Sequence, residues 1–249
     1  IAQPDALWLS QIGSFFNFDV GNAADNHSIN LIAATGTVNE IRYMISNRDL
    51  QIFGASGELY IPTYLNQSIT PTNAQIRLQT PYGCEFSQPI SLDGATLFVQ
   101  NGGNVVREYI YTDGEDAYTA TAVSTIASHL IYSPKYMTVA HGAFQTAESF
   151  ALITNGSGDI ALFNSSRSER RASWTRLTTA GRFDSVCATH DRIFANIYDE
   201  NGNLHLCEFT GNIGLDRYVT ATGSASGEVT VSSAFANGET VSVLSSDGA

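Results

Sequence analysis

Short apolar stretches with a period of two recur along the chain, and pairs of them flank turns that contain glycine. These turns lie at Gly54/Gly57, Gly102-Gly103, Gly156/Gly158 and Gly202, roughly every 45 to 55 residues. The alternation and the many β-branched and aromatic residues predict a β-hairpin around each turn. A lone hairpin cannot bury both of its faces, and this repeat length is close to that of β-propeller blades. The sequence therefore predicts an all-β fold of stacked antiparallel blades.

The strands expected around the four turns come in pairs. They are Leu50–Phe53 with Leu59–Ile61, Thr96–Gln100 with Val105–Tyr111, Phe150–Ile153 with Ile160–Phe163, and Ile193–Tyr198 with Leu204–Phe209. Six successive strands are expected between Ser149 and Phe209, which we interpret as one blade and the start of the next. Trp174 is expected at the contact between blades. The best helix candidate is Ala120–His129, with a loop as the alternative.

The composition changes after Gly211 to Ser, Thr, Ala and Gly with few large side chains. We therefore divide the chain into propeller blades over residues 1-211 and the start of a small β module over residues 212-249. Val229–Val231 and Thr240–Leu244 are the strand candidates of that module. The chain begins with Ile1 and ends just after a strand-like run, so we expect it to be a segment of a longer protein, here a partial β-propeller.

The charge of the chain is strongly acidic, with 24 acidic and 12 basic residues and a net charge of −12. Lys135 is the only lysine, so the other basic residues are arginines. An acidic surface cannot gain affinity by releasing counterions from a phosphate backbone, which argues against ordinary nucleic-acid binding. The same surface repels DNA, which suits a protein that DNA must pass without binding.

A search for motifs that carry chemistry finds none. The five histidines lack metal-ligand spacing, and the metalloprotease, phosphate-loop and nucleophile-elbow motifs are all missing. The densest acidic cluster is Asp113, Glu115 and Asp116, which we interpret as a solvated turn; the alternative is a cation site or a catalytic acid. We therefore predict no catalytic, cofactor-binding or metal-binding residue, no cofactor and no enzymatic activity.

The cysteines and a cluster of arginines allow alternative interpretations. The cysteines Cys84, Cys187 and Cys207 are expected to be buried reduced thiols, although the last two fall in neighbouring predicted strands and could approach each other. An arginine cluster is a solvated hairpin, a strand edge that pairs with acids on a neighbouring chain, or a nucleic-acid patch, the last of which the acidic net charge argues against. Its members are Arg167, Arg170, Arg171, Arg176 and Arg182.

The N-terminal part of the chain is rich in aromatic residues. Trp8, Phe16 and Phe18 alternate with smaller residues as buried strand faces do, so we expect them in the core. The alternative is a carbohydrate-binding surface.

Several short stretches, taken together and in order, resemble the tail nozzle proteins of short-tailed bacteriophages, also called tail tubular protein B. The stretches run over nearly the whole chain. They are Leu7-Trp8-Leu9-Ser10, Phe15-Phe16-Asn17-Phe18, Ile41-Arg42-Tyr43, Arg48-Asp49-Leu50-Gln51-Ile52-Phe53 with Gly57-Glu58, Ile69-Thr70-Pro71-Thr72, Tyr82-Gly83-Cys84, Leu97-Phe98-Val99-Gln100-Asn101-Gly102-Gly103 with Val106-Arg107-Glu108, Glu169 with Trp174, and Asn237-Gly238-Glu239-Thr240-Val241-Ser242-Val243-Leu244 with Asp247-Gly248-Ala249.

The resemblance implies a structural virion protein, located in the phage tail and made in the cytoplasm of the bacterial host. Members of the family form a six-fold ring at the distal end of the tail, from a propeller with inserted β modules. The partners implied are copies of the same protein, the tail adaptor and other tail proteins or fibres. DNA passes through the central channel without specific binding, and neither a membrane span nor a catalytic residue is expected. The family's proteins are several times longer than this chain.

Two other functions are open on the sequence. A propeller that binds or cleaves host surface polysaccharide is the main alternative, and a pair of carboxylates about 5–10 Å apart in an aromatic-lined pocket is the sign of a cleaving enzyme. A cellular WD40-like interaction platform is the second. The blade signature of that family, Gly-His followed by Trp-Asp, is missing.

Overall fold

The computed structural model describes residues 3–22, 24–33, 36, 38–63, 68–142, 148–166, 171–189, 192–209, 219–221 and 229–231. Nearly all regular structure in these residues is β, so the chain is all-β as predicted. The described part contains one short helix, the 3₁₀ helix η1 (Thr125–Leu130). No described helix has the length and apolarity that crossing a membrane requires.

The strands form a series of antiparallel sheets in chain order. A two-stranded sheet of β1 (Ala6–Leu9) and β2 (Ile29–Ile32) comes first. Three four-stranded sheets follow: β3 (Ile41–Ser46), β4 (Leu50–Gly54), β5 (Glu58–Ile61) and β6 (Arg77–Thr80); β7 (Ile90–Leu92), β8 (Ala95–Val99), β9 (Val106–Thr112) and β10 (Ala117–Ala122); β11 (Pro134–His141), β12 (Ser149–Asn155), β13 (Ile160–Ser166) and β14 (Arg171–Leu177). A three-stranded sheet of β15 (Arg182–Thr189), β16 (Arg192–Tyr198) and β17 (Leu204–Phe209) comes next, and β18 (Val219–Ala221) pairs with β19 (Val229–Val231).

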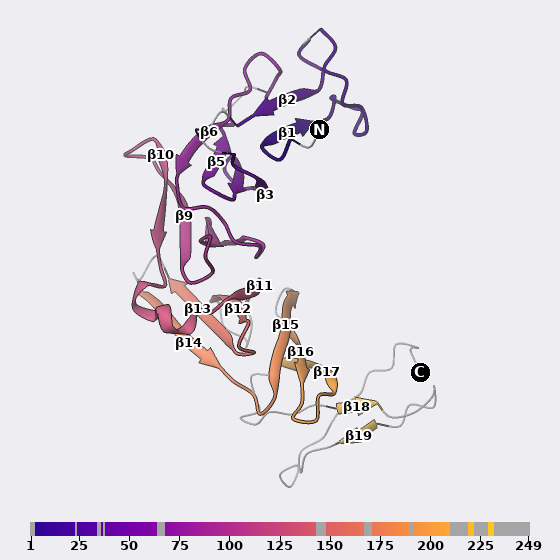
Figure 1. Cartoon of the computed structure of the whole chain (residues 1–249), viewed down its shortest axis with the longest axis vertical. Coiled ribbons are helices and arrows are strands. Elements are labelled where there is room, and N and C mark those ends of the chain that lie inside the picture. The colour runs from indigo at the N-terminus through magenta and orange to yellow at the C-terminus, as the bar shows by residue number, and fades with distance from the viewer. Residues whose placement is uncertain are drawn as a thin grey trace.

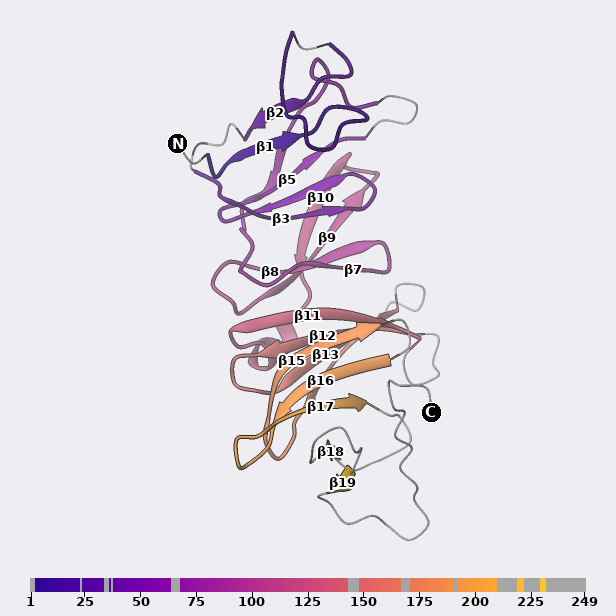
Figure 2. The same ribbon diagram turned by 90° about the vertical axis from the view of Figure 1, so that its right-hand side faces the viewer.

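Each of the three large sheets is a meander, because every strand pairs with the strand that precedes or follows it in the chain. The first strands of the four successive sheets begin at Ile41, Ile90, Pro134 and Arg182, so the structural repeat is 44 to 49 residues long. The sheets follow one another along an open arc (Figure 1). Turned by 90°, they lie one above the other (Figure 2). This is the blade-like order that the recurring hairpins predict, and the described strands do not close into a barrel.

Apolar residues fill the space between each sheet and the next. One cluster joins the β1–β2 sheet to β4 and β5 through Leu7, Ile52 and Leu59. Aromatic residues, including Phe53 and Phe98, join the β3–β6 and β7–β10 sheets. The remaining two clusters lie between the β7–β10 and β11–β14 sheets and between the β11–β14 and β15–β17 sheets. The core is thus divided into four layers, one for each contact between successive sheets.

Three of the four recurring hairpins are the two middle strands of the large sheets, and the fourth is formed by β16 and β17 of the three-stranded sheet, which confirms the four predicted hairpins. Strand β8 is buried at every position, and β4 and β12 are buried at most of theirs, because a neighbouring sheet covers each face. Such strands read as nearly continuous apolar runs, which makes them easy to recognise in a sequence. Trp174 on β14 also behaves as predicted. Its ring lies 4.6 Å from that of Phe163, and its Nε1–H donates to the Val123 carbonyl of the preceding sheet at 3.0 Å.

Two predictions about the elements between residues 117 and 141 were wrong in whole or in part. The helix expected over Ala120–His129 holds only for its second half, the short 3₁₀ helix η1; residues 120–122 belong to β10, which pairs with β9 and inserts Tyr118 and Ala120 into the aromatic cluster. Strand β11 was missed, so the blade expected to begin at Ser149 begins at Pro134. A register shift between Pro134 and Tyr136 disturbs the period-two alternation at the start of this strand.

The expected small module lies largely outside the described residues. Val229–Val231 is a strand as predicted, whereas Thr240–Leu244 lies outside the described part of the chain. The division at residue 211 stays a prediction.

Candidate functional site

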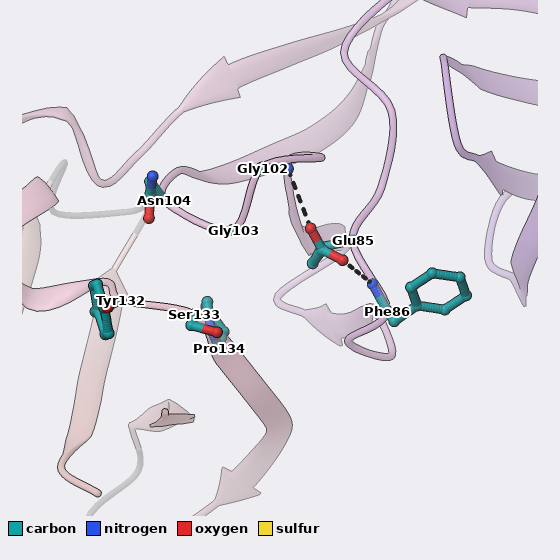
Figure 3. Close-up of a pocket in the computed structure, with 8 residues that line it drawn as sticks. All are labelled: Glu85, Phe86, Gly102, Gly103, Asn104, Tyr132, Ser133 and Pro134. Carbon is teal, nitrogen blue, oxygen red and sulfur yellow. Dashed lines mark hydrogen bonds between the residues drawn. The ribbon is translucent and has the colours of Figure 1, made fainter. Parts of the chain in front are cut away.

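An open groove lies beside the contact between the β7–β10 and β11–β14 sheets. Its volume is about 410 Å³, and three loops supply its walls. They are the β6–β7 connection (Glu85, Phe86), the β8–β9 turn (Gly102, Gly103, Asn104) and the connection from η1 to β11 (Tyr132, Ser133, Pro134). Figure 3 shows Glu85 in the middle, with Phe86 and Tyr132 on opposite sides of it.

Two backbone groups hold the Glu85 carboxylate in place. It accepts hydrogen bonds from the amide N–H of Phe86 at 3.0 Å and from that of Gly102 at 3.1 Å. The bond from Phe86 is the main reason that the pKa of Glu85 lies below its ordinary value. Hydrogen bonds of this kind favour the charged form, so the groove presents a fixed negative charge at neutral pH.

The groove also needs glycine at one of its positions. Gly103 is buried and has a φ of 72°, and a Cβ on it would lie 3.7 Å from Ser133 Cα and 4.0 Å from a Glu85 carboxylate oxygen. The left-handed backbone is accessible to glycine without strain. The β8–β9 turn thus lies close to Ser133 at the start of the β11–β14 sheet, and the β7–β10 and β11–β14 sheets meet at the groove.

Aromatic side chains flank the groove on both sides. Phe86 and Tyr132 are 63% and 64% exposed. The Arg42 guanidinium lies over the Phe86 ring, 3.9 Å from its centroid, so one face of this ring is already covered. Exposed rings beside a carboxylate can bind the apolar faces and the hydroxyl groups of a sugar.

A second polar site is buried between the β3–β6 and β7–β10 sheets. Glu58 on β5 is fully buried, and one of its carboxylate oxygens accepts hydrogen bonds from the Thr80 hydroxyl and the Tyr82 amide. Within the described part of the chain, the other oxygen, Oε1, has no hydrogen-bond partner, and neither does the nearby Tyr109 hydroxyl. Burial raises the pKa of Glu58 to about 7 and places the pKa of Tyr109 well above its ordinary value.

The other buried polar groups between the β3–β6 and β7–β10 sheets are more fully hydrogen-bonded. Asp49 accepts from the Tyr118 hydroxyl at 2.7 Å, from the Thr63 amide at 2.7 Å and from the Thr63 hydroxyl at 3.0 Å. The Thr96 hydroxyl donates to Gln51 across the two sheets. The buried polar groups thus connect one sheet to the next.

The predicted acidic turn is a solvent-exposed hairpin, as interpreted from the sequence. Asp113, Glu115 and Asp116 occupy the β9–β10 turn and are all exposed. Asp113 accepts from Arg48 at 3.0 Å, and Asp116 accepts from the Tyr111 hydroxyl, which raises the pKa of Tyr111 to about 12. In the described residues, no group of three His, Cys, Asp or Glu side chains could hold a metal ion.

The three described arginines of the predicted cluster do not converge on one site. Arg176 pairs with Asp159 at 2.7 Å, and Arg182 lies over the Tyr198 ring at 4.4 Å. Arg171 is exposed at the start of β14, and Arg167 and Arg170 lie outside the described residues. Stacking on aromatic rings is a recurring use of arginine here. The described pairs are Arg42 on Phe86, Arg48 on Tyr111, Arg107 on Tyr82, Arg182 on Tyr198 and Arg192 on Phe194.

The expectation of a buried N-terminal aromatic cluster was wrong. Trp8 is 45% exposed, Phe16 97% and Phe18 46%, whereas Leu7, which precedes Trp8, is buried. The expectation for the cysteines holds only for Cys84, because Cys187 is exposed and Cys207 is half-buried. Strand β16 lies between the strands of Cys187 and Cys207, and no disulfide joins the three cysteines.

Neither the groove nor the buried Glu58 was found from the sequence. Both depend on loops or strands from different sheets. The Tyr82-Gly83-Cys84-Glu85 stretch carried a partial signal, since Gly83 has a φ of 71° and a Cβ there would lie 2.2 Å from the Ala55 carbonyl oxygen. Sequence alone does not say which turn approaches this glycine.

No protein-family model matches the sequence, and no curated protein matches it.

Proposed function

We propose that this chain is a structural protein of a bacteriophage tail nozzle, where stacked β-sheets shape the channel through which DNA leaves. The observation that carries this proposal is the open arc of successive meander sheets with a repeat of 44 to 49 residues. A stack of short-looped antiparallel sheets is stiff, and it protects the edges of its strands from aggregation. The resemblance of the sequence to tail nozzle proteins supports the same function.

The chemistry of the described residues agrees with a role that depends on shape. The groove contains one carboxylate, Glu85, among its lining residues, and the buried Glu58 is inaccessible to a substrate. The net charge of −12 opposes DNA binding and is suited to a conduit that DNA crosses without adhering to it.

Native mass spectrometry and cryo-electron microscopy of the full-length protein, alone and with its tail adaptor, test this proposal. A six-fold ring with an open central channel would support it. A protein that stays monomeric with the adaptor and binds or cleaves a polysaccharide would overturn it.

A second candidate function is glycan binding at the groove, favoured by the exposed Tyr132 ring beside the fixed Glu85 carboxylate and Asn104. The groove lining lacks the second carboxylate that glycoside hydrolysis needs, so binding without cleavage is the function that fits. Titration with oligosaccharides from a bacterial surface polysaccharide, followed by calorimetry, tests it. Binding that is lost in Tyr132→Ala and kept in Tyr136→Ala, a control at an exposed tyrosine outside the groove lining, would support this candidate; no binding by the wild type would exclude it for those sugars.

A further inference from the structure

The carboxylate of Glu85 in the groove can accept more hydrogen bonds than it receives from the chain. One of its oxygens accepts from the Phe86 amide and the other from the Gly102 amide. An ionised carboxylate offers about two acceptor positions on each oxygen, so one position on each oxygen of Glu85 remains. Within the described residues, Glu85 forms no ion pair with an arginine or a lysine. Its charge is fixed in place without a paired cation.

The aromatic wall across the groove from Glu85 is also held in place (Figure 3). The Tyr132 amide donates to the side-chain oxygen of Asn155 at 3.1 Å, and the Tyr132 carbonyl accepts from the Gly156 amide at 3.1 Å. The next residue, Ser133, has a φ of 46°, in the left-handed region that residues other than glycine rarely adopt. Strained backbone of this kind is concentrated at ligand-binding sites. The exposed Tyr132 ring is therefore presented on a fixed backbone.

Two arginines elsewhere in the chain each combine an aromatic ring with a carboxylate. The two triads are Arg48 with Tyr111 and Asp113, and Arg192 with Phe194 and Glu208. The guanidinium carbons lie 3.9 and 4.9 Å from the ring centroids, and the ion-pair distances are 3.0 and 2.6 Å. In both triads, the guanidinium group stacks with its face and donates with its edge, which the compact ammonium group of lysine cannot do.

The groove supplies the ring and the carboxylate of such a triad without the arginine. Among the described residues, no arginine lies over the Tyr132 ring. Arg42 covers the other flanking ring, Phe86, but it donates to the Cys84 carbonyl and is not part of the groove lining. The side of Glu85 that faces Tyr132 thus stays open to a cation from outside the chain.

We propose that the groove binds an arginine side chain, which a basic segment of a partner protein presents. The guanidinium group donates to the two remaining acceptor positions of Glu85 in the bidentate geometry that carboxylates favour. The Tyr132 ring packs against the same side chain. A groove of about 410 Å³ is in the size range of small-ligand pockets, so it has room for one side chain and the backbone beside it.

The charge of the whole chain favours the same occupant. A net charge of −12 attracts a basic segment and speeds its association. A neutral sugar could use the Tyr132 ring, but it would leave the charge of Glu85 without a counterion, so arginine uses more of the groove than the glycan candidate does. An arginine site goes beyond the proposed function, because it can exist whether or not the chain belongs to a nozzle.

Nuclear magnetic resonance of the ¹⁵N-labelled 249-residue chain tests this site. The probe is a capped pentapeptide with one arginine between glycines, and the amides of Phe86, Gly102 and Gly103 report on its binding. We expect shifts of these amides that saturate with a Kd of about 1 mM and weaken with added salt. The same peptide with citrulline, which has nearly the shape of arginine and no charge, should bind about tenfold more weakly.

Two variants separate the charge from the ring. Glu85→Gln keeps the shape of the side chain and should weaken the arginine peptide about tenfold, whereas Tyr132→Ala should weaken it about threefold. Glu115→Gln and Tyr136→Ala are the matched controls, because both residues are exposed and lie outside the groove lining; they should bind as the wild type does. The ¹⁵N spectra also verify that each variant folds.

Several results would overturn the arginine site. They are the absence of saturable shifts at the three amides, equal binding of the citrulline peptide, and unchanged binding by a folded Glu85→Gln variant. Shifts that are as large at the exposed β9–β10 turn as in the groove would indicate unspecific attraction and equally exclude it. If the oligosaccharides shift the groove amides and the arginine peptide does not, the groove belongs to the glycan candidate. None of these results decides the nozzle proposal, which is tested by the assembly of the full-length protein.

Discussion

The contact between the β3–β6 and β7–β10 sheets and the contact between the β11–β14 and β15–β17 sheets, here called the first and the second joint, differ in their chemistry. The first contains Glu58, Asp49, Tyr109 and Tyr118 in its buried layer. The buried members of the second are aliphatic residues and Phe183, and Phe150 and Phe209 pack against them. Repeated sheets can therefore be joined in two ways, one sensitive to solution conditions and the other not.

The difference has a physical origin in desolvation. An aliphatic joint is stabilised by removing apolar surface from water, in proportion to the area buried and with little dependence on pH. A buried carboxyl group must find hydrogen-bond partners or lose its charge. Asp49 has three donors, whereas one oxygen of Glu58 has none, so Glu58 is the group whose protonation decides the stability of the first joint.

The largest effect is expected from opening a cavity in the aliphatic joint. Leu152 is fully buried, so Leu152→Ala should lower the free energy of unfolding by about 3–4 kcal/mol. The loss should be equal at pH 5 and pH 8, as measured by urea unfolding. Ile126→Ala on the exposed surface should change stability by less than about 0.5 kcal/mol. If the loss of stability in Leu152→Ala varied strongly with pH, the aliphatic joint would also depend on a titrating group, and the contrast between the two joints would be wrong.

Neutralising Glu58 should affect the first joint in a pH-dependent way. Its pKa is raised from 4.5 to about 7 in the folded protein, so the unfolded chain releases this proton first and stability falls as pH rises between these values. The shift corresponds to at most about 3 kcal/mol. Glu58→Gln should therefore be more stable than the wild type at pH 8, with the difference shrinking toward pH 5, by urea unfolding.

The control for Glu58 is Glu85→Gln. Because the pKa of Glu85 is lowered, its charged form stabilises the fold above its ordinary pKa, and this contribution disappears as pH falls. Glu85→Gln should therefore lower the free energy of unfolding at neutral pH, whereas Glu58→Gln should raise it. Equal effects of the two substitutions would refute the assignment of the pH dependence to burial of Glu58.

Removing one donor from Asp49 should have an intermediate effect. Tyr118→Phe deletes the 2.7 Å hydrogen bond to the buried carboxylate and leaves the ring stacking on Tyr109, whose centroid is 4.6 Å away. We expect a loss of about 2 kcal/mol in chemical denaturation, the range for hydrogen bonds to charged groups. Tyr132→Phe, whose ring is exposed, is the matched control and should be nearly neutral. A neutral Tyr118→Phe would mean that the remaining two donors satisfy Asp49.

The smallest effect is expected at the surface of the last sheet. Arg192 makes a bidentate pair with Glu208 at 2.6 and 2.7 Å, but both side chains are partly exposed. A double-mutant cycle of Arg192→Ala and Glu208→Ala should give a coupling of about 0.5 kcal/mol that declines with added salt. A coupling that is insensitive to salt would place this pair in a drier environment than the structure shows.

The sequence predicted the central strands well and the outer parts poorly, for identifiable reasons. Strand β8 is covered on both faces, so its apolar run is visible without any knowledge of its neighbours. The last residues of β10, from Ala120 to Ala122, were taken for the start of a helix, because alanine favours a helix locally and only pairing with β9 decides the outcome. Trp8 and Phe16 were expected in the core because hydrophobicity alone does not say whether another sheet is present to cover a side chain.

The site was less predictable than the fold. Glu58 looks like an ordinary strand-end carboxylate in the sequence, and its burial results from packing against a sheet that begins more than 30 residues later, at Ile90. The groove around Glu85 likewise requires the turn at Gly102 and the segment at Tyr132 to meet it. Such encounters depend on the angle between sheets, which the local pattern does not encode.

The meander order has a consequence for how the chain folds. The substantial contacts between sheets join only sheets that follow each other along the chain. Folding can then start in any sheet and spread to its neighbours, as in other quasi-one-dimensional proteins. Amide hydrogens should exchange with solvent fastest in the terminal sheets and slowest in β8 and β12, which have a neighbour on either side.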